Sequence, residues 1–251
     1  FSRIQFTPDL MPSDVLGTTV FNMKTNGFDF HQGPIFADIV LVDEINRAPA
    51  KTQAALFEVM EERQVSIDGT THRMGELYTI LATQNPVEQE GTYKLPEAQL
   101  DRFLMKITMD YPSLEEEVNI LERHHTNAAL VKLEDVTPVL TKEELLSLRA
   151  LMSRVFVDRT LLQYIALIVQ QTRTSKAVYL GASPRASVAM LQSSKAYALL
   201  QGRDFVTPED IKFVAPYVLQ HRLILTAEAE MEGYSPVKVT QRLIDKVEVP
   251  K

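Results

Sequence analysis

Two adjacent carboxylates, Asp43 and Glu44, directly follow four apolar residues at 39–42. The run is mostly β-branched, which is typical of a strand buried on both faces of a parallel sheet. At the carboxyl end of such a strand, the first acid can hold the magnesium ion of a nucleotide through water, and the second can orient a water toward the γ-phosphate. This is the Walker B pattern. The alternative is a strand that merely ends in two solvated acids.

A polar amide, Asn85, follows a second predicted strand at 78–84 and precedes a proline. Between the two strands, residues 50–63 place apolar side chains on one face of a helix and glutamates on the face toward water. A strand, a helix and a strand in this order predict a right-handed crossover and a parallel sheet. We therefore expect Asn85 to emerge at the same edge of the sheet as Asp43.

Two arginines stand at the start of further predicted elements. Arg102 lies at the mouth of a short strand expected within 101–107, and Arg185 follows Ser183 and a proline that are typical of the start of a helix. Taken alone, each arginine has an ordinary alternative role. Arg102 could form a strand-end salt bridge, and Arg185 could be a surface residue of its helix.

Two hairpins are predicted from alternating segments that enclose turn residues. Residues 17–33 turn at Asn26-Gly27, and residues 64–74 turn at Asp68-Gly69. The first hairpin carries four large apolar side chains among polar ones: Phe21, Met23, Phe28 and Phe30. Such side chains can form a contact surface for a partner, or they can pack one face of the hairpin onto the sheet.

The composition restricts the class of protein. Among the 251 residues, 45% are hydrophobic, 24% are charged and none is cysteine, which excludes disulfides and thiolate metal sites. The net charge of −7 argues against general nucleic-acid binding and favours peptide or protein partners. No stretch approaches the roughly 18 apolar residues of a membrane span, and we expect a cytoplasmic protein.

Residues 1–111 alternate strands with helices, and residues 112–251 have only helical patterns. We therefore predict an α/β domain over 1–111 and a small all-helical domain over 112–251. Helix starts are predicted from the capping-box spacings of Ser113 with Glu116 and Thr141 with Glu144, and from the hydroxyl-proline pair at 207–208. Gly202 is expected to end the helix before that pair.

With these segments placed, the chain resembles the MoxR family of AAA+ ATPases over essentially its whole length. Six motifs in order at family-like spacing carry the resemblance: RIQFTPDL at 3–10, GPIFA at 33–37, VDEINRAP at 42–49, ATQNP at 82–86, LPEAQLDRF at 95–103 and GASPRA at 181–186. Each motif alone is weak, and the set together is specific.

The resemblance implies a P-loop type α/β core with a parallel sheet and hairpin insertions, followed by an all-α lid domain. It implies ATP and Mg²⁺ as cofactors, with Asp43 on the metal and Glu44 as the catalytic glutamate of Walker B. Asn85 would be sensor 1, Arg102 the arginine finger and Arg185 the nucleotide-binding sensor 2 arginine. The hairpins would be the helix-2 insert and the pre-sensor-1 insertion. The expected partners are copies of the chain in a ring, with six subunits as the expected number, and a protein substrate, for which the family suggests a von Willebrand factor A-type domain protein.

The chain departs from the family in one respect. It contains no Gly-x-x-x-x-Gly-Lys-Ser/Thr loop to hold the phosphates, and its nine glycines are not arranged that way. The family places this loop upstream of Phe1, so we expect the complete protein to be the ATPase and this fragment alone to be inactive. Two alternatives are a protein-binding module that has lost nucleotide chemistry and a nucleic-acid-remodelling AAA+ relative, which the acidic balance disfavours.

Overall fold

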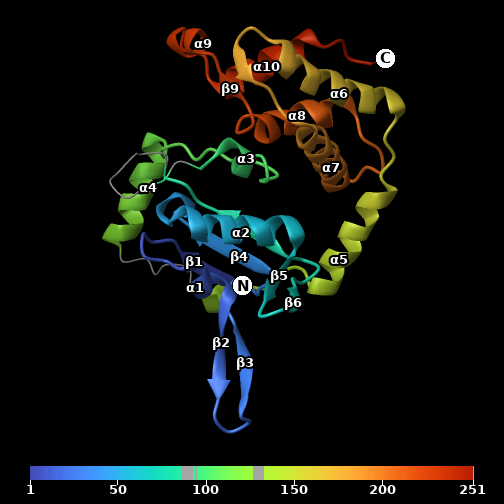
Figure 1. The fold of residues 1–251 in the computed structure, drawn as a ribbon. Coiled ribbons are helices and arrows are strands. Elements are labelled where there is room, and N and C mark those ends of the chain that lie inside the picture. Colours follow the sequence, from blue (N-terminus) through green and yellow to red (C-terminus); the bar gives the residue numbers. More distant parts are fainter. Residues whose placement is uncertain (86–92, 94, 127–132, 251) are drawn as a thin grey trace. The chain divides into compact units, whose positions relative to one another are not determined.

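The computed structural model describes residues 1–85, 93, 95–126 and 133–250 (Figure 1). The chain divides into two compact units. The first comprises residues 1–104 together with 182–186, and the second comprises 105–181 and 187–251. The predicted domain boundary after residue 111 stays a prediction, because this grouping interleaves the two halves of the chain.

The first unit is built on a parallel sheet with the order β1-β4-β7 among the described residues. Its strands are β1 (Ser2–Gln5), β4 (Ile39–Asp43) and β7 (Thr79–Ala82). Gln5 lies opposite Asp43, and Val42 lies opposite Ala82, so the three carboxyl ends meet at one edge. The predicted parallel sheet with helices is confirmed, and the shared edge brings the residues after β4 and β7 close together.

The core of this unit lies between the sheet and α2 (Ala50–Glu62). Val40 and Val42 of β4 are buried together with Leu56 of α2, whereas Ile39 keeps 45% of its surface exposed. Alternate residues of a strand point to opposite faces, so Val40 and Val42 lie on a buried face and Ile39 lies on the opposite, partly exposed face. The prediction that this strand is buried on both faces was therefore wrong.

Shorter elements complete the first unit. They are α1 (Pro12–Leu16), the 3-10 turn η1 (Ile45–Arg47) and α3 (Glu97–Leu100).

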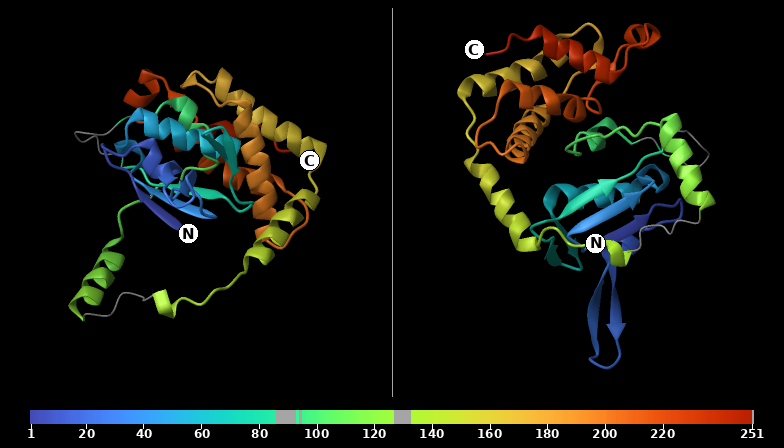
Figure 2. Two further views of the ribbon diagram at one scale, coloured as in Figure 1. Left: turned by 60° about the horizontal axis from the view of Figure 1, so that its bottom comes forward. Right: turned by 180° about the vertical axis from the view of Figure 1, so that it is seen from behind.

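Two antiparallel hairpins extend from the first unit (Figure 2). They are β2 (Gly17–Asn22) with β3 (Gly27–Gln32), and β5 (Gln64–Ile67) with β6 (Thr70–Arg73). The β5–β6 hairpin turns at Asp68-Gly69 as predicted, and both of these residues have positive φ. The first closes through a four-residue loop at 23–26 with Asn26 alone in the left-handed region, so the predicted two-residue Asn-Gly turn was wrong.

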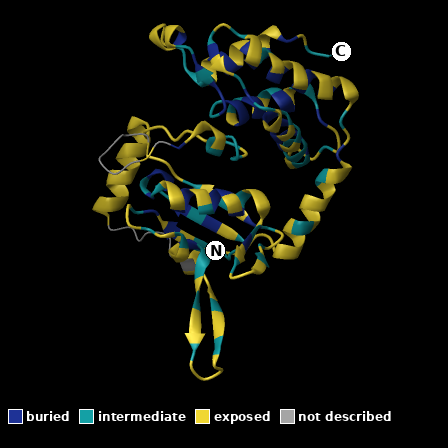
Figure 3. Cartoon of the chain, in the orientation of Figure 1, coloured by how far each residue is buried: buried dark blue, intermediate teal, exposed yellow. Residues whose placement is uncertain are grey.

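The long β2–β3 hairpin is anchored at its base and exposed toward its tip (Figure 3). Thr19 donates a hydrogen bond of 2.5 Å to Asp68 of the second hairpin, and the ring of Phe30 lies 4.4 Å from that of His72. Phe21 and Phe28 pair across the strands but remain largely exposed. The hairpin is thus fixed to its neighbour through Phe30, while its outer apolar side chains are available for contact.

The second unit is mostly helical. Its helices are α4 (Leu114–His125), α5 (Lys142–Leu151), α6 (Arg159–Thr174), α7 (Pro184–Leu200, whose first residues group with the first unit), α8 (Pro208–Leu219), α9 (Ala227–Met231) and α10 (Pro236–Lys246). None of the described helices is long and apolar enough to cross a membrane. Strands β8 (Val178–Leu180) and β9 (Ile224–Leu225) pair in antiparallel fashion, so the unit is not purely helical as predicted.

The predicted helix boundaries are found in the second unit. Ser113 and Glu116 form the capping box of α4, and Thr141 and Glu144 form that of α5. Gly202 has φ of 72° and its N–H donates to the carbonyl of Leu199. The following N–H donates to the carbonyl at 198, which completes a Schellman motif after α7.

The short strand predicted within 101–107 is absent from the described sheet, which corrects that prediction. A strand needs a neighbour for its backbone groups. Here the N–H of Lys106 donates to the carbonyl of Tyr217, and the side-chain amide of Gln220 donates to the carbonyl of Lys106. The segment therefore satisfies its polar groups at the carboxyl end of α8.

A buried ion pair stabilises the second unit. Arg203 binds both carboxylate oxygens of Asp210, which also accepts the N–H of Thr207 at 2.7 Å. Burial opposes ionisation of Asp210, but the hydrogen bonds from Arg203 and Thr207 outweigh it, and the pKa of this carboxyl is lowered. Because the folded pKa lies below the unfolded value of about 3.9, the pair stabilises the fold above that pH and loses its effect as the pH falls further.

We expect Asp210→Asn to destabilise the second unit by about 3 kcal/mol at neutral pH, the size typical of removing one partner of a buried pair. Thermal unfolding monitored by circular dichroism should show a smaller difference between the variant and the parent protein as the pH falls below 4. A difference that stays constant down to pH 2 would contradict the assigned cause.

Candidate functional site

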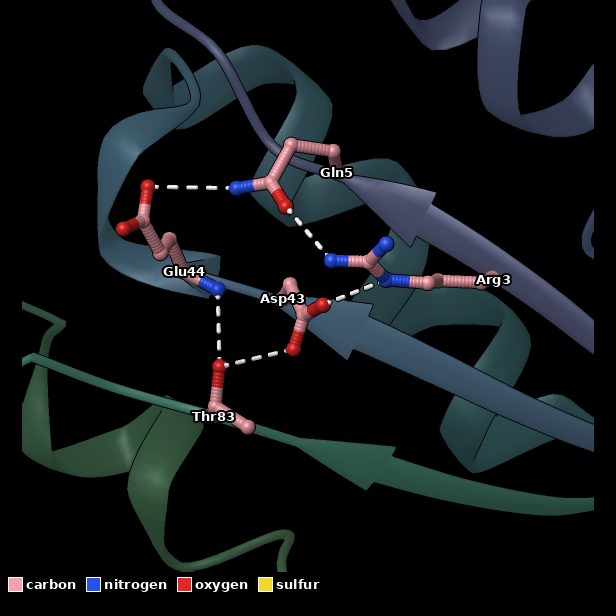
Figure 4. Close-up of polar contacts among 5 residues, drawn as sticks. All are labelled: Arg3, Gln5, Asp43, Glu44 and Thr83. Atoms are coloured by element: carbon pink, nitrogen blue, oxygen red, sulfur yellow. Dashed lines mark hydrogen bonds and ion pairs between the residues drawn. The ribbon is translucent and has the colours of Figure 1, made fainter. Parts of the chain in front are cut away.

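Asp43 is the last residue of β4, and both of its carboxylate oxygens have partners (Figure 4). Oδ2 accepts a hydrogen bond of 2.7 Å from Nε of Arg3 on β1. Oδ1 accepts one of 3.1 Å from the hydroxyl of Thr83, which follows β7. The side chain of Asp43 is only 16% exposed and is held between its two neighbouring strands.

Glu44 adopts a left-handed backbone conformation with φ of 55° and ψ of 50°. This conformation costs a non-glycine residue roughly 1 kcal/mol and occurs often at functional sites. The N–H of Glu44 is held at 3.0 Å by the hydroxyl of Thr83. Its Oε2 accepts from Nε2 of Gln5 at 3.1 Å and lies 3.0 Å from Nη1 of Arg47. The turn therefore separates the two carboxylates and gives each its own partners.

Thr83, Arg3 and Gln5 were missed as site residues by the sequence analysis. The hydroxyl of Thr83 bridges the side chain of Asp43 and the backbone of Glu44, and Arg3 also donates to Gln5 at 3.4 Å (Figure 4). A signal was present in the sequence. Arg3 and Gln5 alternate along the strand that leads to the carboxyl edge, and Thr83 is the first residue after the next strand.

Asn85 lies two residues beyond Thr83 on the same segment, so it emerges at the carboxyl edge as expected. Its backbone carbonyl accepts a hydrogen bond of 3.2 Å from the side-chain amide of Asn46 in the turn after Glu44. The fold thus brings together the segments that carry Asp43, Glu44 and Asn85. The following Pro86 lies outside the described residues.

Arg102 and Arg185 lie elsewhere in the first unit. Both form ion pairs with one carboxylate, that of Glu61 near the carboxyl end of α2. Glu61 was predicted to face water, and its role as a shared partner was missed. It stands eleven positions after the first residue of α2, which corresponds to about 16 Å along the helix. The two arginines therefore gather at the end of α2 that lies away from Glu44.

The carboxyl edge offers ligands suited to magnesium. The Oδ1 atom of Asp43 lies 3.1 Å from the hydroxyl oxygen of Thr83 there, and Mg²⁺ prefers one or two carboxylates completed by water and phosphate oxygens. No group of three or more histidine or acidic ligands occurs among the described residues. The donor set therefore fits an ion that is shared with a phosphate ligand, and it does not fit a metal enclosed by the protein alone.

Two family models match the chain. Residues 1–105 match the ATPase family associated with various cellular activities, abbreviated AAA, and residues 170–245 match the AAA lid domain. The first match contains Asp43, Glu44, Asn85 and Arg102, and the second contains Arg185.

Similar proteins cover the whole chain. YeaC from Bacillus subtilis is 48% identical over 250 residues, which are 100% of this chain and 77% of YeaC. Chaperone MoxR1 from Mycobacterium tuberculosis is 44% identical over 260 residues, with 100% of this chain and 68% of MoxR1 covered. The crystal structure of a proposed ATPase from Cytophaga hutchinsonii superposes with a TM-score of 0.89 at 41% identity, covering 100% of this chain and 78% of that protein.

Proposed function

The chain belongs to the MoxR family of AAA+ ATPases, and from this membership we propose that the full-length protein hydrolyses ATP with Mg²⁺ at the carboxyl edge of its sheet. One observation carries the proposal. Asp43 and Glu44 end a parallel strand in a strained turn that gives the two carboxylates separate partners. Separate surroundings allow the two acids to have separate duties.

Asp43 would hold the metal through water, and its bond from Thr83 fixes the direction of its carboxylate. Bound Mg²⁺ supplies positive charge that offsets the negative charge building up on the phosphate oxygens. Arg3 now occupies one oxygen of Asp43, so its guanidinium would have to move or share that oxygen. Glu44 would orient the attacking water and accept its proton, while Asn85 would polarise that water or a phosphate oxygen without adding charge.

Arg102 and Arg185 would act on the phosphates as cations. Arg102 stands at the far end of α2 from Glu44, which supports a role at the nucleotide of a neighbouring subunit. We infer that subunits form a ring, with six as the proposed number, and that Arg185 contacts a bound nucleotide. Both arginines would exchange Glu61 for phosphate oxygens.

The direct test is ATP hydrolysis by the full-length protein with Mg²⁺ and with a chelator. We expect phosphate release that requires the metal. Tight nucleotide binding without any turnover, under conditions where the ring is assembled, would favour a binding module instead.

We further propose that the protein assembles or activates a protein partner, with a von Willebrand factor A-type domain protein as the candidate class and the cytoplasm as the place. The relative named Chaperone MoxR1 supports a chaperone-like role. The tip of the β2–β3 hairpin is the proposed contact. Phe21, Met23 and Phe28 expose 47%, 90% and 74% of their surface there.

We expect the double change Phe21→Ser and Phe28→Ser to reduce partner activation at least tenfold, because it removes exposed apolar surface from the tip. Basal ATP turnover and melting temperature should stay unchanged. Phe30→Ser is the matched control, since its ring packs against Phe36 and His72 at the base, and it should lower the melting temperature. Loss of stability in the double variant would show that the tip is structural.

A further inference from the structure

We propose that Asn46 is a positioning residue that fixes the backbone of Asn85 relative to the turn carrying Asp43 and Glu44. The inference rests on the function proposed above and assigns a role to a residue outside the predicted site. It concerns how the segment after β4 and the segment after β7 are held in fixed positions relative to each other.

Asn46 lies in η1, immediately after Glu44 and Ile45, and is 5% exposed. Its Nδ2 donates to the carbonyl of Asn85 at 3.2 Å, and its own carbonyl accepts the N–H of Tyr93 at 2.7 Å. One residue thus binds the chain at positions 85 and 93. These two hydrogen bonds tie both positions to the turn after Glu44.

A second link runs parallel to the first. The N–H of Ile45 donates to the carbonyl of Thr83 at 3.0 Å, and the hydroxyl of Thr83 accepts the N–H of Glu44. Thr83 therefore fixes the start of the segment after β7, and Asn46 fixes it two residues later.

The choice of asparagine is informative because only one of its two side-chain polar groups has a partner among the described residues. Its Oδ1 is buried and has no hydrogen-bond partner among the described residues. A buried acceptor without a partner destabilises a fold, and an apolar side chain of similar size would avoid that cost. The Nδ2 donor to Asn85 is the contact that such a side chain could not make.

Precise placement of Asn85 matters for the proposed chemistry. Catalytic groups act over distances at which a displacement of about 1 Å can cost 10²-fold in rate. Asn85 itself is exposed. The bond from the buried Asn46 supplies a fixed point, and it extends from the same turn that orients Glu44.

The test uses the full-length protein with Asn46→Leu, which keeps the size of the side chain and removes both polar groups. We expect kcat for ATP hydrolysis to fall at least tenfold, KM to change less than threefold, and the melting temperature to stay equal or rise. Thr52→Val is the matched control. Thr52 is also buried and donates to a backbone carbonyl, that of Leu10, away from the site, so this variant should lose stability and keep kcat.

A double-mutant cycle with Asn85→Ala tests whether Asn46 acts through Asn85. The double variant should be no slower than Asn85→Ala alone. The inference would be overturned if the losses in kcat of the two single variants multiplied in the double variant. It would also be overturned if kcat of Asn46→Leu were unchanged, or if kcat fell only in proportion to a fall in melting temperature. If Asn85→Ala is fully active, both the inference and the proposed role of Asn85 fail.

A measurement that does not depend on ATP hydrolysis can test this inference independently of the ATPase proposal. Amide hydrogen exchange in the peptide that ends at Asn85 should be faster in Asn46→Leu than in the parent protein or in Thr52→Val. Equal exchange in all three would overturn the inference even if the protein hydrolyses ATP. Faster exchange in a protein that proves inactive would support the tether while the proposed function fails.

Discussion

Replacing Glu44 with glutamine is expected to leave ATP bound and to slow its hydrolysis by about 10²- to 10⁴-fold, the usual contribution of a general base. Glutamine keeps the size of the side chain and an oxygen that can accept the bond from Gln5, so the turn should persist. It lacks the negative charge that draws a proton from water. Phosphate release and retained nucleotide, measured on the same sample, check this result.

Glu62→Gln is a suitable control for Glu44→Gln. Glu62 is an exposed glutamate at the end of α2, and its loss should leave turnover unchanged. If Glu44→Gln hydrolyses ATP as fast as the parent protein, Glu44 is not the catalytic base. In that case the strained turn at this position would need another explanation.

Arg102→Ala is expected to bind ATP nearly normally and to lose about 10³- to 10⁵-fold in hydrolysis, the range measured for arginine fingers. A surface salt bridge such as that of Arg102 with Glu61 could not account for an effect of this size. Arg73→Ala, which removes an exposed arginine from β6, is the control and should remain active.

Mixing subunits decides whether Arg102 acts across an interface. Arg102→Ala subunits combined with an excess of Glu44→Gln subunits should regain part of the activity, because some interfaces then have Glu44 on one side and Arg102 on the other. If mixed rings are verified but remain as inactive as rings of either single variant, Arg102 does not act in trans.

The order of the site segments could be predicted because the relevant signals are local. Apolar runs before Asp43 and Asn85 with a helix between them dictate a parallel pair of strands, and parallel strands place their carboxyl ends together. The Asp68-Gly69 turn could likewise be predicted, since both residues readily adopt positive φ.

The contacts within the site could not be predicted from the sequence. The bond of Thr83 to Asp43 and that of Gln5 to Glu44 depend on the register between strands that are far apart in the chain. Glu61 looked like a solvated helix residue because nothing local indicates that Arg102 reaches it. Tertiary contacts also decided the segment predicted as a strand within 101–107, because the N–H of Lys106 donates to the carbonyl of Tyr217 in α8 and not to the sheet.

The measurement that most directly tests the central claim is the Mg²⁺ dependence of ATP binding by full-length Asp43→Asn, Glu44→Gln and parent protein. Equilibrium binding of a fluorescent ATP analogue should become tighter with Mg²⁺ in the parent and in Glu44→Gln, because both keep the metal carboxylate. Asp43→Asn should lose most of that gain, since a neutral amide binds the metal and its waters more weakly. An equal gain from Mg²⁺ in all three proteins would contradict a magnesium-nucleotide site at Asp43.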